Sequence, residues 1–321
     1  MPSREITGVL CCGNVCFDMP VWPVDRMAWG TSTWVETIGE SLGGNGGNTS
    51  YALARLGVPV RLTGVVGTDA NGDKVLSALN AAGVDAGRVR RDRSVPTTAT
   101  VVVVHPSGDR LFLHLPGASK SLEASEVLLN RGDSLSHFHL ANPYSLPKVR
   151  TQGAELLARA RSAGFTTSLD TGYDSQGRWL EDIGPCLPFT DLLFVNETEL
   201  QFLSGEQATT PGLLRLAALG AGDVVVKLGG RGCALMQGGE ISEFPGFSVP
   251  VKDTSGAGDS FVGGFLASLH RQRSYRESAR FANAVGACKV QALGAAQGVL
   301  TFDETERWIA SQKATGGHAP E

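Results

Sequence analysis

Three small residues precede an aspartate in the stretch VKDTSGAGDSFVGGFLASL, which spans residues 251–269. Gly256, Ala257 and Gly258 come directly before Asp259, where an apolar helical pattern begins. An acidic residue in a first helical turn is common, because it complements the positive end of the helix dipole. The small residues indicate more, since they leave backbone N–H groups accessible to a second negative charge. The stretch therefore predicts an anion site beside a carboxylate.

Two other glycine-rich stretches contain residue types that bind ligands. Residues 42–57 (LGGNGGNTSYALARLG) combine glycines with asparagines at the entry to a helix, so they can present N–H groups and amides to a polyhydroxylated ligand. Residues 227–232 (KLGGRG) follow a strong strand, which places them at the sheet edge where α/β folds bind ligands. Each stretch alone is also compatible with a simple turn or hairpin.

The overall composition favours a small-molecule partner. A net charge of -4 and a pI near 5.9 give no positive surface for nucleic acid or an anionic membrane. No apolar run reaches the roughly 18 residues of a membrane helix, and the first residues lack the apolar core of a signal peptide. We therefore expect a cytoplasmic protein that binds neither nucleic acid nor membrane. The common phosphate-loop, dinucleotide, hydrolase and zinc-protease motifs are absent from the sequence.

The six cysteines and six histidines show neither a disulfide pattern nor a metal-binding pattern. Cys11, Cys12 and Cys16 lie close together in the sequence, but they lack a second cluster at the spacing of a zinc site. We expect buried free thiols. His137 and His139 alternate as they would in a strand, and no metal triad is visible in the sequence.

Apolar runs rich in β-branched residues alternate with helical patterns along the chain, which predicts an α/β fold with a doubly wound, mostly parallel sheet flanked by helices. The predicted strands lie at residues 6–14, 60–67, 136–142, 166–170, 191–196 and 223–229. Two helical patterns cover residues 48–57 and 73–83 and end at Gly57 and Gly83. We expect a single domain over residues 1–312 and a disordered tail over residues 313–321.

Two segments depart from this alternation and predict a small separate sheet. Residues 16–38 and 97–115 read as strands with a two-residue period, and the second segment folds into a hairpin around residues 106–109. The first segment contains three tryptophans, Trp22, Trp29 and Trp34. Two interpretations of these rings remain open, because they can either line a pocket or form an apolar patch or subunit contact.

The order of four motifs resembles that of the PfkB, or ribokinase, family of carbohydrate kinases. The motifs are GGNGGN at 43–48, NETE at 196–199, KLGGRG at 227–232 and DTSGAGD at 253–259. The resemblance covers about residues 6–300. It implies a ribokinase-like fold with a small β-sheet lid, and an ATP-dependent enzyme that phosphorylates a sugar hydroxyl with the help of Mg²⁺.

The resemblance also assigns roles to the stretch around Asp259. It makes Asp259 the general base that takes the proton from the attacking sugar hydroxyl. It makes the backbone amides of Gly256, Ala257 and Gly258 an anion hole for the γ-phosphoryl group. These roles agree with the chemistry, because phosphoryl transfer depends on positioning and on charge stabilisation more than on covalent catalysis.

The remaining expected roles follow from the same resemblance. The sugar-binding residues are Asp18, Gly44, Asn45 and Asn48. The ATP-binding residues are Asn196, Lys227, Gly229, Gly232 and Asn283. Asn196 and Glu199 organise Mg²⁺ through water, which suits an ion that dehydrates reluctantly. Asp253, Ser255 and Gly294 match a loop that binds K⁺ in some relatives.

The identity of the acceptor is less determined by the motifs. Residues 169–174 (LDTGYD) lack the arginine that relatives acting on 2-keto-3-deoxygluconate or fructose often carry, which argues against an acidic sugar. Residues 31–48 contain no lysine or arginine for a sugar phosphate. Arginines at position 26 and within residues 88–93 could still reach in from elsewhere. We expect a neutral, ribose-like or fructose-like acceptor.

Two alternatives to this acceptor and one assembly state remain open. The tryptophans would offer stacking surfaces to a nucleoside acceptor. A non-catalytic sugar or nucleotide sensor is the third hypothesis, and the intact Asp259 argues against it. Family members often dimerise through their lid sheets, which makes a homodimer through the lid a further expectation.

Overall fold

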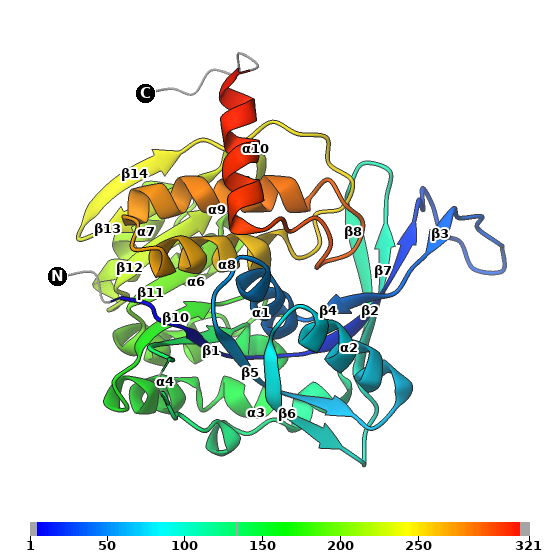
Figure 1. Ribbon diagram of the computed structural model, residues 1–321, viewed down its shortest axis with the longest axis horizontal. Coiled ribbons are helices and arrows are strands. Elements are labelled where there is room, and N and C mark those ends of the chain that lie inside the picture. Colours follow the sequence, from blue (N-terminus) through cyan, green and yellow to red (C-terminus); the bar gives the residue numbers. More distant parts are fainter. Residues whose placement is uncertain (1–4, 133, 315–321) are drawn as a thin grey trace.

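The computed structural model describes residues 5–132 and 134–314. It contains a large sheet of nine strands flanked by helices and a smaller sheet of five strands at one side (Figure 1). The nine strands run in the order β14-β13-β12-β11-β10-β9-β1-β5-β6. They are parallel except at one edge, where β13 and β14 pair in antiparallel fashion. The predicted fold class is confirmed.

The six predicted strands all lie in the large sheet. They are β1 (Val9–Gly13), β5 (Val60–Gly67), β9 (His137–Ala141), β10 (Thr166–Asp170), β11 (Leu192–Asn196) and β12 (Asp223–Lys227). The sheet also contains β13 (Cys233–Gln237), β14 (Glu240–Phe244) and β6 (Asp85–Asp92). Strand β6 was not predicted, because it is a polar edge strand with few buried residues.

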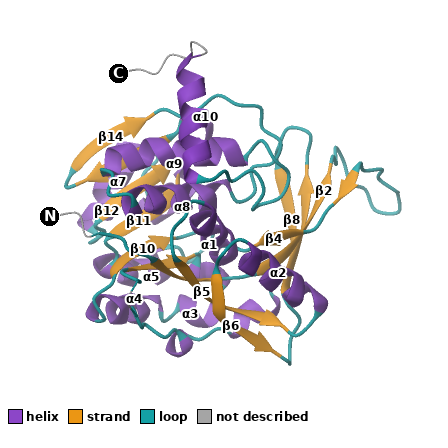
Figure 2. Ribbon diagram, viewed as in Figure 1, coloured by secondary structure: helices purple, strands orange, loops and turns teal. Residues whose placement is uncertain are grey.

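Both faces of the large sheet are buried, as a doubly wound fold requires. Along β1, Val9 and Cys11 belong to one cluster of buried apolar side chains, whereas Leu10 and Cys12 belong to the other. Helices lie on both sides of the strands (Figure 2). The first cluster includes side chains of α1 (Asn45–Arg55), α2 (Ala70–Ala81), α8 (Ala257–His270), α9 (Tyr275–Lys289) and α10 (Phe302–Ala314). The second includes side chains of α3 (Pro147–Arg150), α4 (Gly153–Ser162), α5 (Leu180–Ile183), α6 (Glu197–Ser204) and α7 (Thr209–Ala218).

The stretch of glycines and asparagines forms the first turn of helix α1. The helix begins at Asn45, earlier than the predicted start at residue 48. Gly44 precedes it with a φ of 81°, and a Cβ at this position would lie 2.6 Å from the carbonyl oxygen of Asn14. Position 44 therefore requires glycine, both for its conformation and for the close approach of the backbone. As a result, Asn45 and Asn48 share one turn of α1.

The predicted helix ends are confirmed at two glycines. Gly57 and Gly83 follow α1 and α2 with φ angles of 82° and 91°. A residue in this left-handed conformation ends a helix, and glycine adopts it without steric cost. Helix α2 begins before the predicted residue 73, because the side chain of Asp69 accepts a hydrogen bond from the N–H of Gly72 and caps the helix.

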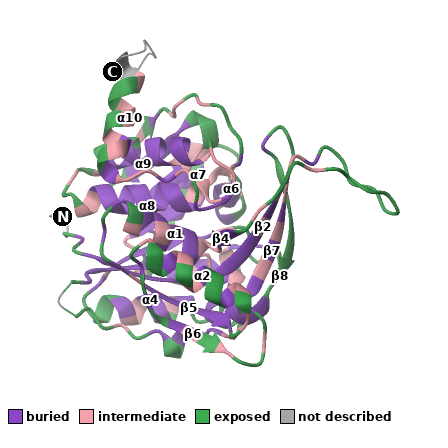
Figure 3. Ribbon diagram, turned by 45° about the vertical axis from the view of Figure 1, so that its right-hand side comes forward, coloured by how far each residue is buried: buried purple, intermediate pink, exposed green. Residues whose placement is uncertain are grey.

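The smaller sheet contains most of the two segments predicted for it. Its strands are β2 (Cys16–Trp22), β3 (Thr37–Ile38), β4 (Ser41–Gly43), β7 (Thr98–Val104) and β8 (Arg110–Leu115). The β7–β8 hairpin turns where expected, with the N–H of His105 bonded to the carbonyl of Asp109. Residues 23–36 do not form the expected strand; they make a connection that projects from the sheet (Figure 1). Figure 3 shows that β2 is mostly buried whereas β8 is exposed.

The three tryptophans do not form a pocket. Trp29 and Trp34 are fully or almost fully exposed on the projecting connection, so the pocket-lining interpretation is wrong for both rings. Trp22 is partly buried, and the ammonium of Lys252 lies 5.1 Å from the centre of its ring. The two exposed rings remain available to the other interpretation, a contact with another molecule.

Several smaller expectations can also be compared with the structure. All six cysteines are buried and free within the described part of the chain, as predicted. Helix α10 continues to Ala314, so the expected disordered tail does not begin at residue 313, and the rest of that tail lies outside the described residues. In residues 5–132 and 134–314, no helix is long and apolar enough to cross a membrane.

Candidate active site

A cleft of about 720 Å³ lies at the carboxyl edge of the large sheet, where β10, β11 and β12 end beside the start of α8. This is the edge at which open α/β sheets bind ligands. The predicted site residues that line it are Asn45, Asn196, Glu199, Lys227, Gly229, Gly232, Gly256, Ala257, Gly258, Asp259 and Asn283. The other predicted residues lie outside this lining and are Asp18, Gly44, Asn48, Asp253, Ser255 and Gly294.

Asp259 lies on the first turn of α8 and is held by two amides from α1. Its Oδ1 accepts a hydrogen bond of 2.8 Å from Asn45 Nδ2, and its Oδ2 accepts one of 2.8 Å from Asn48 Nδ2. The residue is 5% exposed. Burial, and then the negative charge of Asp170, raises the pKa of the Asp259 carboxyl to about 6. The carboxylate is therefore fixed in orientation and more basic than an ordinary aspartate.

The start of α8 presents backbone N–H groups to the cleft. Gly256 has a φ of 69°, and a Cβ on it would collide with the carbonyl oxygen of Ala295, so glycine is required there. A Cβ on Gly258 would lie 3.4 Å from Lys227 Nζ, which shows how near the amine lies to this turn. Among the described residues, no side chain caps the start of α8. An uncapped helix start beside an amine is a binding site for an anion.

A charged pair lies beside this turn. Lys227 Nζ is 2.7 Å from Asp170 Oδ1, and both residues are the last of their strands. Burial opposes the charge of Lys227, but Asp170 and Glu199 outweigh it and raise the pKa of the lysine. Sequence reasoning gave Asp170 no role in binding or catalysis. Its position at the end of a predicted parallel strand was the available signal.

Asn196 and Glu199 form a reciprocal cap at the start of α6. Asn196 Oδ1 accepts from the N–H of Glu199 at 2.8 Å, and Glu199 Oε2 accepts from the N–H of Asn196 at 2.8 Å. Thr171 donates a further hydrogen bond to Glu199, which is 3% exposed. Burial raises the pKa of the Glu199 carboxyl, and the charge of Lys227 opposes this.

The donor set around Glu199 fits Mg²⁺ held mainly by phosphates and water. Within residues 5–132 and 134–314, no group of three acidic, histidine or cysteine side chains could enclose a metal ion. Mg²⁺ keeps several waters and is commonly bound by one or two carboxylates together with substrate phosphates. A single carboxylate at the cleft wall is sufficient for that arrangement.

A network of asparagines extends from Asp259 toward the small sheet, which corresponds to the predicted lid. Asn142 Nδ2 donates to Asn45 Oδ1 at 2.8 Å, and Asn14 Oδ1 accepts from the N–H of Asn45 at 2.9 Å. In the part of the chain that the structure describes, Asn48 Oδ1 and Asn142 Oδ1 are buried without a hydrogen-bond partner. These two oxygens have unused capacity to accept hydrogen bonds. Sequence reasoning gave no role to Asn14 or Asn142, each of which is the last residue of a predicted strand.

Asp18 lies on β2 of the small sheet and is not among the residues that line the cleft. Its carboxyl group packs against Gly43, where a Cβ would collide with it. Burial raises the pKa of Asp18 to about 6, and the charges of Asp259 and Asp253 contribute to this rise. Asp18 is thus close enough to Asp259 for the two carboxylates to affect each other.

The glycine stretch after β12 and the amide of Asn283 shape the opposite end of the cleft. Gly232 has a φ of 98°, and a Cβ there would collide with the carbonyl of Phe244. Asn283 Nδ2 donates to the carbonyls of Phe244 at 3.1 Å and Pro245 at 3.2 Å. Asn283 therefore holds a loop whose next residues, including Phe247, line the cleft.

The predicted potassium loop is assembled, but a lysine lies in it. Asp253 Oδ1 accepts from the N–H of Ser255, and Asp253 Oδ2 accepts from the N–H of Gly294, both at 2.8 Å. Lys289 is 0% exposed, and its Nζ donates to the carbonyl of Asp253 at 2.8 Å. These residues do not fit a K⁺ ion as expected, because a protein ammonium already contacts an oxygen at the site.

The lid places one arginine in the cleft that sequence reasoning did not consider. Arg110, at the start of β8, lines the cleft. The residue is exposed, but the protein atoms around its guanidinium partly desolvate it and lower its pKa, and the carboxylates of Asp253, Asp109 and Asp259 oppose this. The arginines suggested from sequence lie elsewhere: Arg26 is exposed, and Arg90 and Arg91 pair with acidic residues away from the cleft.

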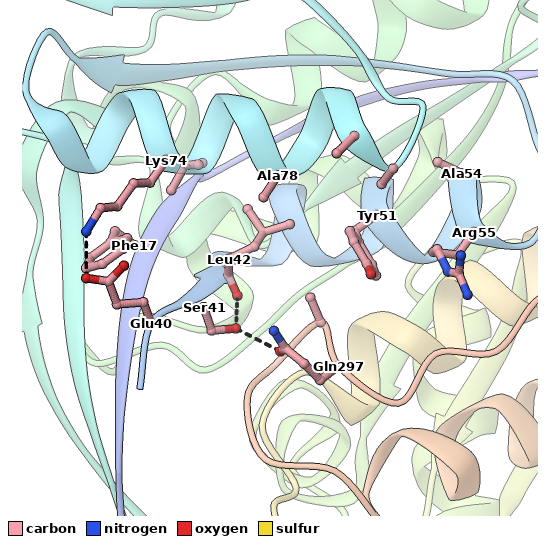
Figure 4. Close-up of a pocket in the computed structure, with 14 residues that line it drawn as sticks. Phe17, Glu40, Ser41, Leu42, Tyr51, Ala54, Arg55, Lys74, Ala78 and Gln297 are labelled. Carbon is pink, nitrogen blue, oxygen red and sulfur yellow. Dashed lines mark hydrogen bonds and ion pairs between the residues drawn. The ribbon is translucent and has the colours of Figure 1, made fainter. Parts of the chain in front are cut away.

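A second pocket, of about 500 Å³, lies between α1, α2 and the lid (Figure 4). It contains none of the predicted site residues. At its edge, Ser41 Oγ on β4 donates to Gln297 Oε1 at 3.0 Å, which joins the lid to the loop after α9 (Figure 4). Lys74 and Glu40 form an exposed ion pair of 2.6 Å at the other end. The Ser41–Gln297 hydrogen bond therefore connects the small sheet to the part of the chain that covers the large sheet.

The family model and two relatives match most of the chain. The model of pfkB family carbohydrate kinases matches residues 7–301. An ATP-dependent ribose-1-phosphate kinase of Halopiger xanaduensis is 32% identical over 282 residues, which cover 87% of this chain and 90% of that protein. A ribokinase of Haemophilus influenzae is 29% identical over 278 residues, or 83% of this chain and 87% of that protein.

Solved structures show the same architecture. The apo form of a putative ribokinase II from E. coli superposes with a TM-score of 0.85 at 24% identity and covers 95% of this chain and 99% of that chain. Arabidopsis thaliana ribokinase, solved with ribose and ATP, gives a TM-score of 0.80 at 25% identity and the same coverage. The chain thus belongs to the pfkB family of carbohydrate kinases, which use ATP to phosphorylate sugars.

Proposed function

We propose that the protein transfers the γ-phosphoryl group of ATP to a hydroxyl of a neutral, ribose-like or fructose-like sugar. The observation that carries this proposal is the position of Asp259. Its buried carboxylate is oriented by two amides and lies beside an uncapped helix start. A base and an anion site at adjacent positions are what in-line transfer to a hydroxyl requires.

Asp259 acts as the general base. Its pKa of about 6 makes it a better proton acceptor than an ordinary aspartate while leaving it largely ionised at neutral pH. Asn45 and Asn48 each donate to one of its oxygens, so the carboxylate cannot rotate freely. The proton of the attacking hydroxyl passes to Asp259 as the oxygen attacks phosphorus.

The N–H groups of Gly256, Ala257 and Gly258, together with Lys227, stabilise the transferring phosphoryl group. Its charge is spread over three oxygens in the transition state, and fixed donors stabilise that charge without reorganising. The proximity of Lys227 Nζ to Gly258 supports a shared role. Asp170 holds the amine in place through its ion pair with Lys227.

ATP binds along the wall formed by Gly229, Gly232 and the loop that Asn283 holds. Asn196 and Glu199 would hold Mg²⁺ through water, and the bound ion would neutralise charge on the phosphates. The proposed enzyme does not use potassium, because the ammonium of Lys289 contacts the site expected to bind it.

The sugar binds on the side of Asp259 that faces the asparagine network. The buried oxygens of Asn48 and Asn142, which lack partners within the described residues, accept hydrogen bonds from sugar hydroxyls. Gly44 sets the start of α1 so that Asn45 and Asn48 share one turn. Asp18 contributes from the lid when the lid closes over the sugar.

A sugar phosphate is a second candidate acceptor, and Arg110 favours it. A guanidinium binds a phosphate with paired hydrogen bonds, and Arg110 brings one into the cleft from the lid. The relative from Halopiger xanaduensis is named for ribose 1-phosphate. A nucleoside acceptor has less support, because Trp29 and Trp34 are exposed away from the cleft.

One panel experiment decides between these acceptors. ADP release is measured with pentoses, hexoses, ribose 1-phosphate and nucleosides, and Asp259→Asn serves as the inactive control. Turnover of a neutral sugar supports the leading proposal. Tight binding of a sugar with only background ATP hydrolysis would replace it with the sensor hypothesis.

Arg110→Gln tests the second acceptor, with Arg26→Gln as an exposed arginine control. If Arg110 binds an acceptor phosphate, KM for ribose 1-phosphate rises about tenfold or more while KM for ribose is unchanged. An equal loss of kcat with both acceptors would place Arg110 at the phosphates of ATP.

The lid sheet is also proposed to join two subunits, in the cytoplasm where ATP is available. All six residues of β8 are exposed, and they include large apolar side chains, Leu111, Phe112, Leu113 and Leu115. An exposed apolar edge strand is a surface that a second copy can cover. Sedimentation at several concentrations tests this, and a monomer throughout, for wild type and Phe112→Ser alike, would contradict it.

A further inference from the structure

Lys289 is a buried cation that the proposed mechanism does not use. It is the last residue of α9, and its side chain is 0% exposed. Its Nζ donates a hydrogen bond of 2.8 Å to the carbonyl oxygen of Asp253. A buried charge is costly unless it is paired or hydrogen-bonded, so an ammonium at this position requires an explanation.

The lysine lies where three chain segments meet. The N–H groups of Lys252 and Asp253 donate to the carbonyl of Val290 at 2.8 Å and 3.1 Å. The Asp253 carboxylate in turn holds the N–H groups of Ser255 and Gly294. Lys289 closes this arrangement from the end of α9.

The joined segments lead directly into the proposed anion hole. Asp253 and Ser255 immediately precede Gly256, and Gly256 packs against the carbonyl of Ala295, which follows Gly294. A shift of residues 253–255 would therefore move the N–H groups that face the phosphoryl group. Small displacements of positioned groups reduce catalysis strongly.

The electrostatic surroundings suit a single positive charge. The carboxylates of Asp253 and Asp259 are the nearby negative charges that favour a cation at this position, and the guanidinium of Arg110 is a nearby positive charge. K⁺ is bound in proteins by carbonyl and carboxylate oxygens that replace its hydration shell, and the ammonium contacts an oxygen of this kind.

We propose that the ammonium of Lys289 takes the place of a monovalent cation at Asp253, Ser255 and Gly294, so that the enzyme needs no K⁺. This rests on the proposed kinase function. Lys289 is then a positioning residue for the anion hole, tethered covalently and always present. A K⁺ ion is kept out, because the ammonium fills the space and repels a second positive charge.

The first test compares wild type in potassium, sodium and tetramethylammonium chloride at one ionic strength. ADP is measured by chromatography, so that no coupling enzyme with its own K⁺ requirement is present. We expect kcat and the melting temperature Tm to be the same in the three salts. Activation or stabilisation of wild type by K⁺ would overturn the inference, since it would show a free cation site.

The second test removes the ammonium. Lys289→Ala should lower kcat about tenfold in sodium, because the anion hole loses its support. K⁺ should restore most of that activity and raise Tm, since a ligand that binds only the folded state stabilises it. Lys289→Met fills the volume without charge and should show no response to K⁺. Lys252→Ala, a lysine beside Asp253 whose ammonium lies over Trp22, should behave as wild type.

The outcomes separate this inference from the proposed function. A folded Lys289→Ala variant that ignores K⁺ in both readouts contradicts a replaced cation. If Lys289→Ala folds in neither salt, the comparison of salts on wild type decides alone. The Tm readout needs no turnover, so it remains valid even if every sugar in the panel fails as an acceptor.

Discussion

The floor of the cleft and the small sheet beside it hold their polar side chains in different ways. On the floor, Asp259, Glu199 and Lys227 lie at the ends of buried elements and each is bonded to a neighbour. In the small sheet, β8 is exposed along its whole length. Its one contribution among the described residues that line the cleft is Arg110.

This difference indicates that the two regions have different functions. Groups that must be placed accurately for chemistry lie on rigid elements and are held by further hydrogen bonds. An edge strand that is exposed along its whole length can move at lower cost, which suits a lid that closes over the sugar and excludes water. Changes on the floor should therefore reduce kcat, and changes in the lid should raise the sugar KM.

The largest effect is expected from Asp259→Asn on the floor. The amide keeps the shape but cannot accept the proton, so kcat should fall about 10² to 10⁴-fold with little change in either KM. Steady-state kinetics at saturating substrates measures this, and nucleotide binding by calorimetry shows that the variant is folded. Retention of more than about a tenth of the wild-type kcat would remove Asp259 from the role of base.

The pH dependence of kcat/KM should reflect one carboxylate from the floor of the cleft and one from the small sheet. Asp259 and Asp18 each have a pKa raised by burial to about 6. Both are needed as carboxylates, so kcat/KM should be about a hundredfold lower at pH 5 than at pH 7, as both take up protons. Asp18→Asn should leave a fall of about tenfold over the same range, because one titrating group remains. An unchanged steep fall in that variant would exclude Asp18.

Asp18→Ala in the lid should raise the sugar KM rather than lower kcat. Loss of one hydrogen bond to a charged group costs about 1.5 to 3 kcal/mol, which is roughly 10 to 150-fold in KM. The KM for ATP should change little. Sugar-induced changes in tryptophan fluorescence should weaken as well, because the lid contains Trp22. A normal sugar KM with a normal fluorescence response would show that closure depends on other residues.

The smallest effect is expected at the joint between the two regions, which is the hydrogen bond between Ser41 of the small sheet and Gln297. Gln297→Ala removes the hydrogen bond to Ser41 on β4. A neutral hydrogen bond contributes about 0.5 to 1.5 kcal/mol, so the sugar KM should change by roughly 2 to 10-fold with kcat nearly constant. Lys74→Ala, which breaks the exposed pair with Glu40, is the matched control and should have no measurable effect. Equal responses of the two variants would mean that the joint plays no part in closure.

Local patterns in the sequence were sufficient for much of the fold. The predicted strands and the glycines that end α1 and α2 depend on neighbours within a few residues, so they are readable directly. Strand β6 was not predicted, because its residues are mostly polar and exposed. Residues 23–36 were wrongly predicted to be part of a strand, because their apolar rings lie on an exposed connection instead.

The motifs determined the family and named eleven of the residues that line the cleft, because glycines and carboxylates at fixed spacing limit the chemistry. Only the tertiary structure decided how they meet. Asn48 reaches Asp259 across 211 positions of sequence, and Lys289 reaches Asp253 across 36. Asn142, Asp170 and Arg110 join the same cleft from separate strands. Such contacts depend on the packing of distant elements, and no local pattern records which side chains that packing brings together.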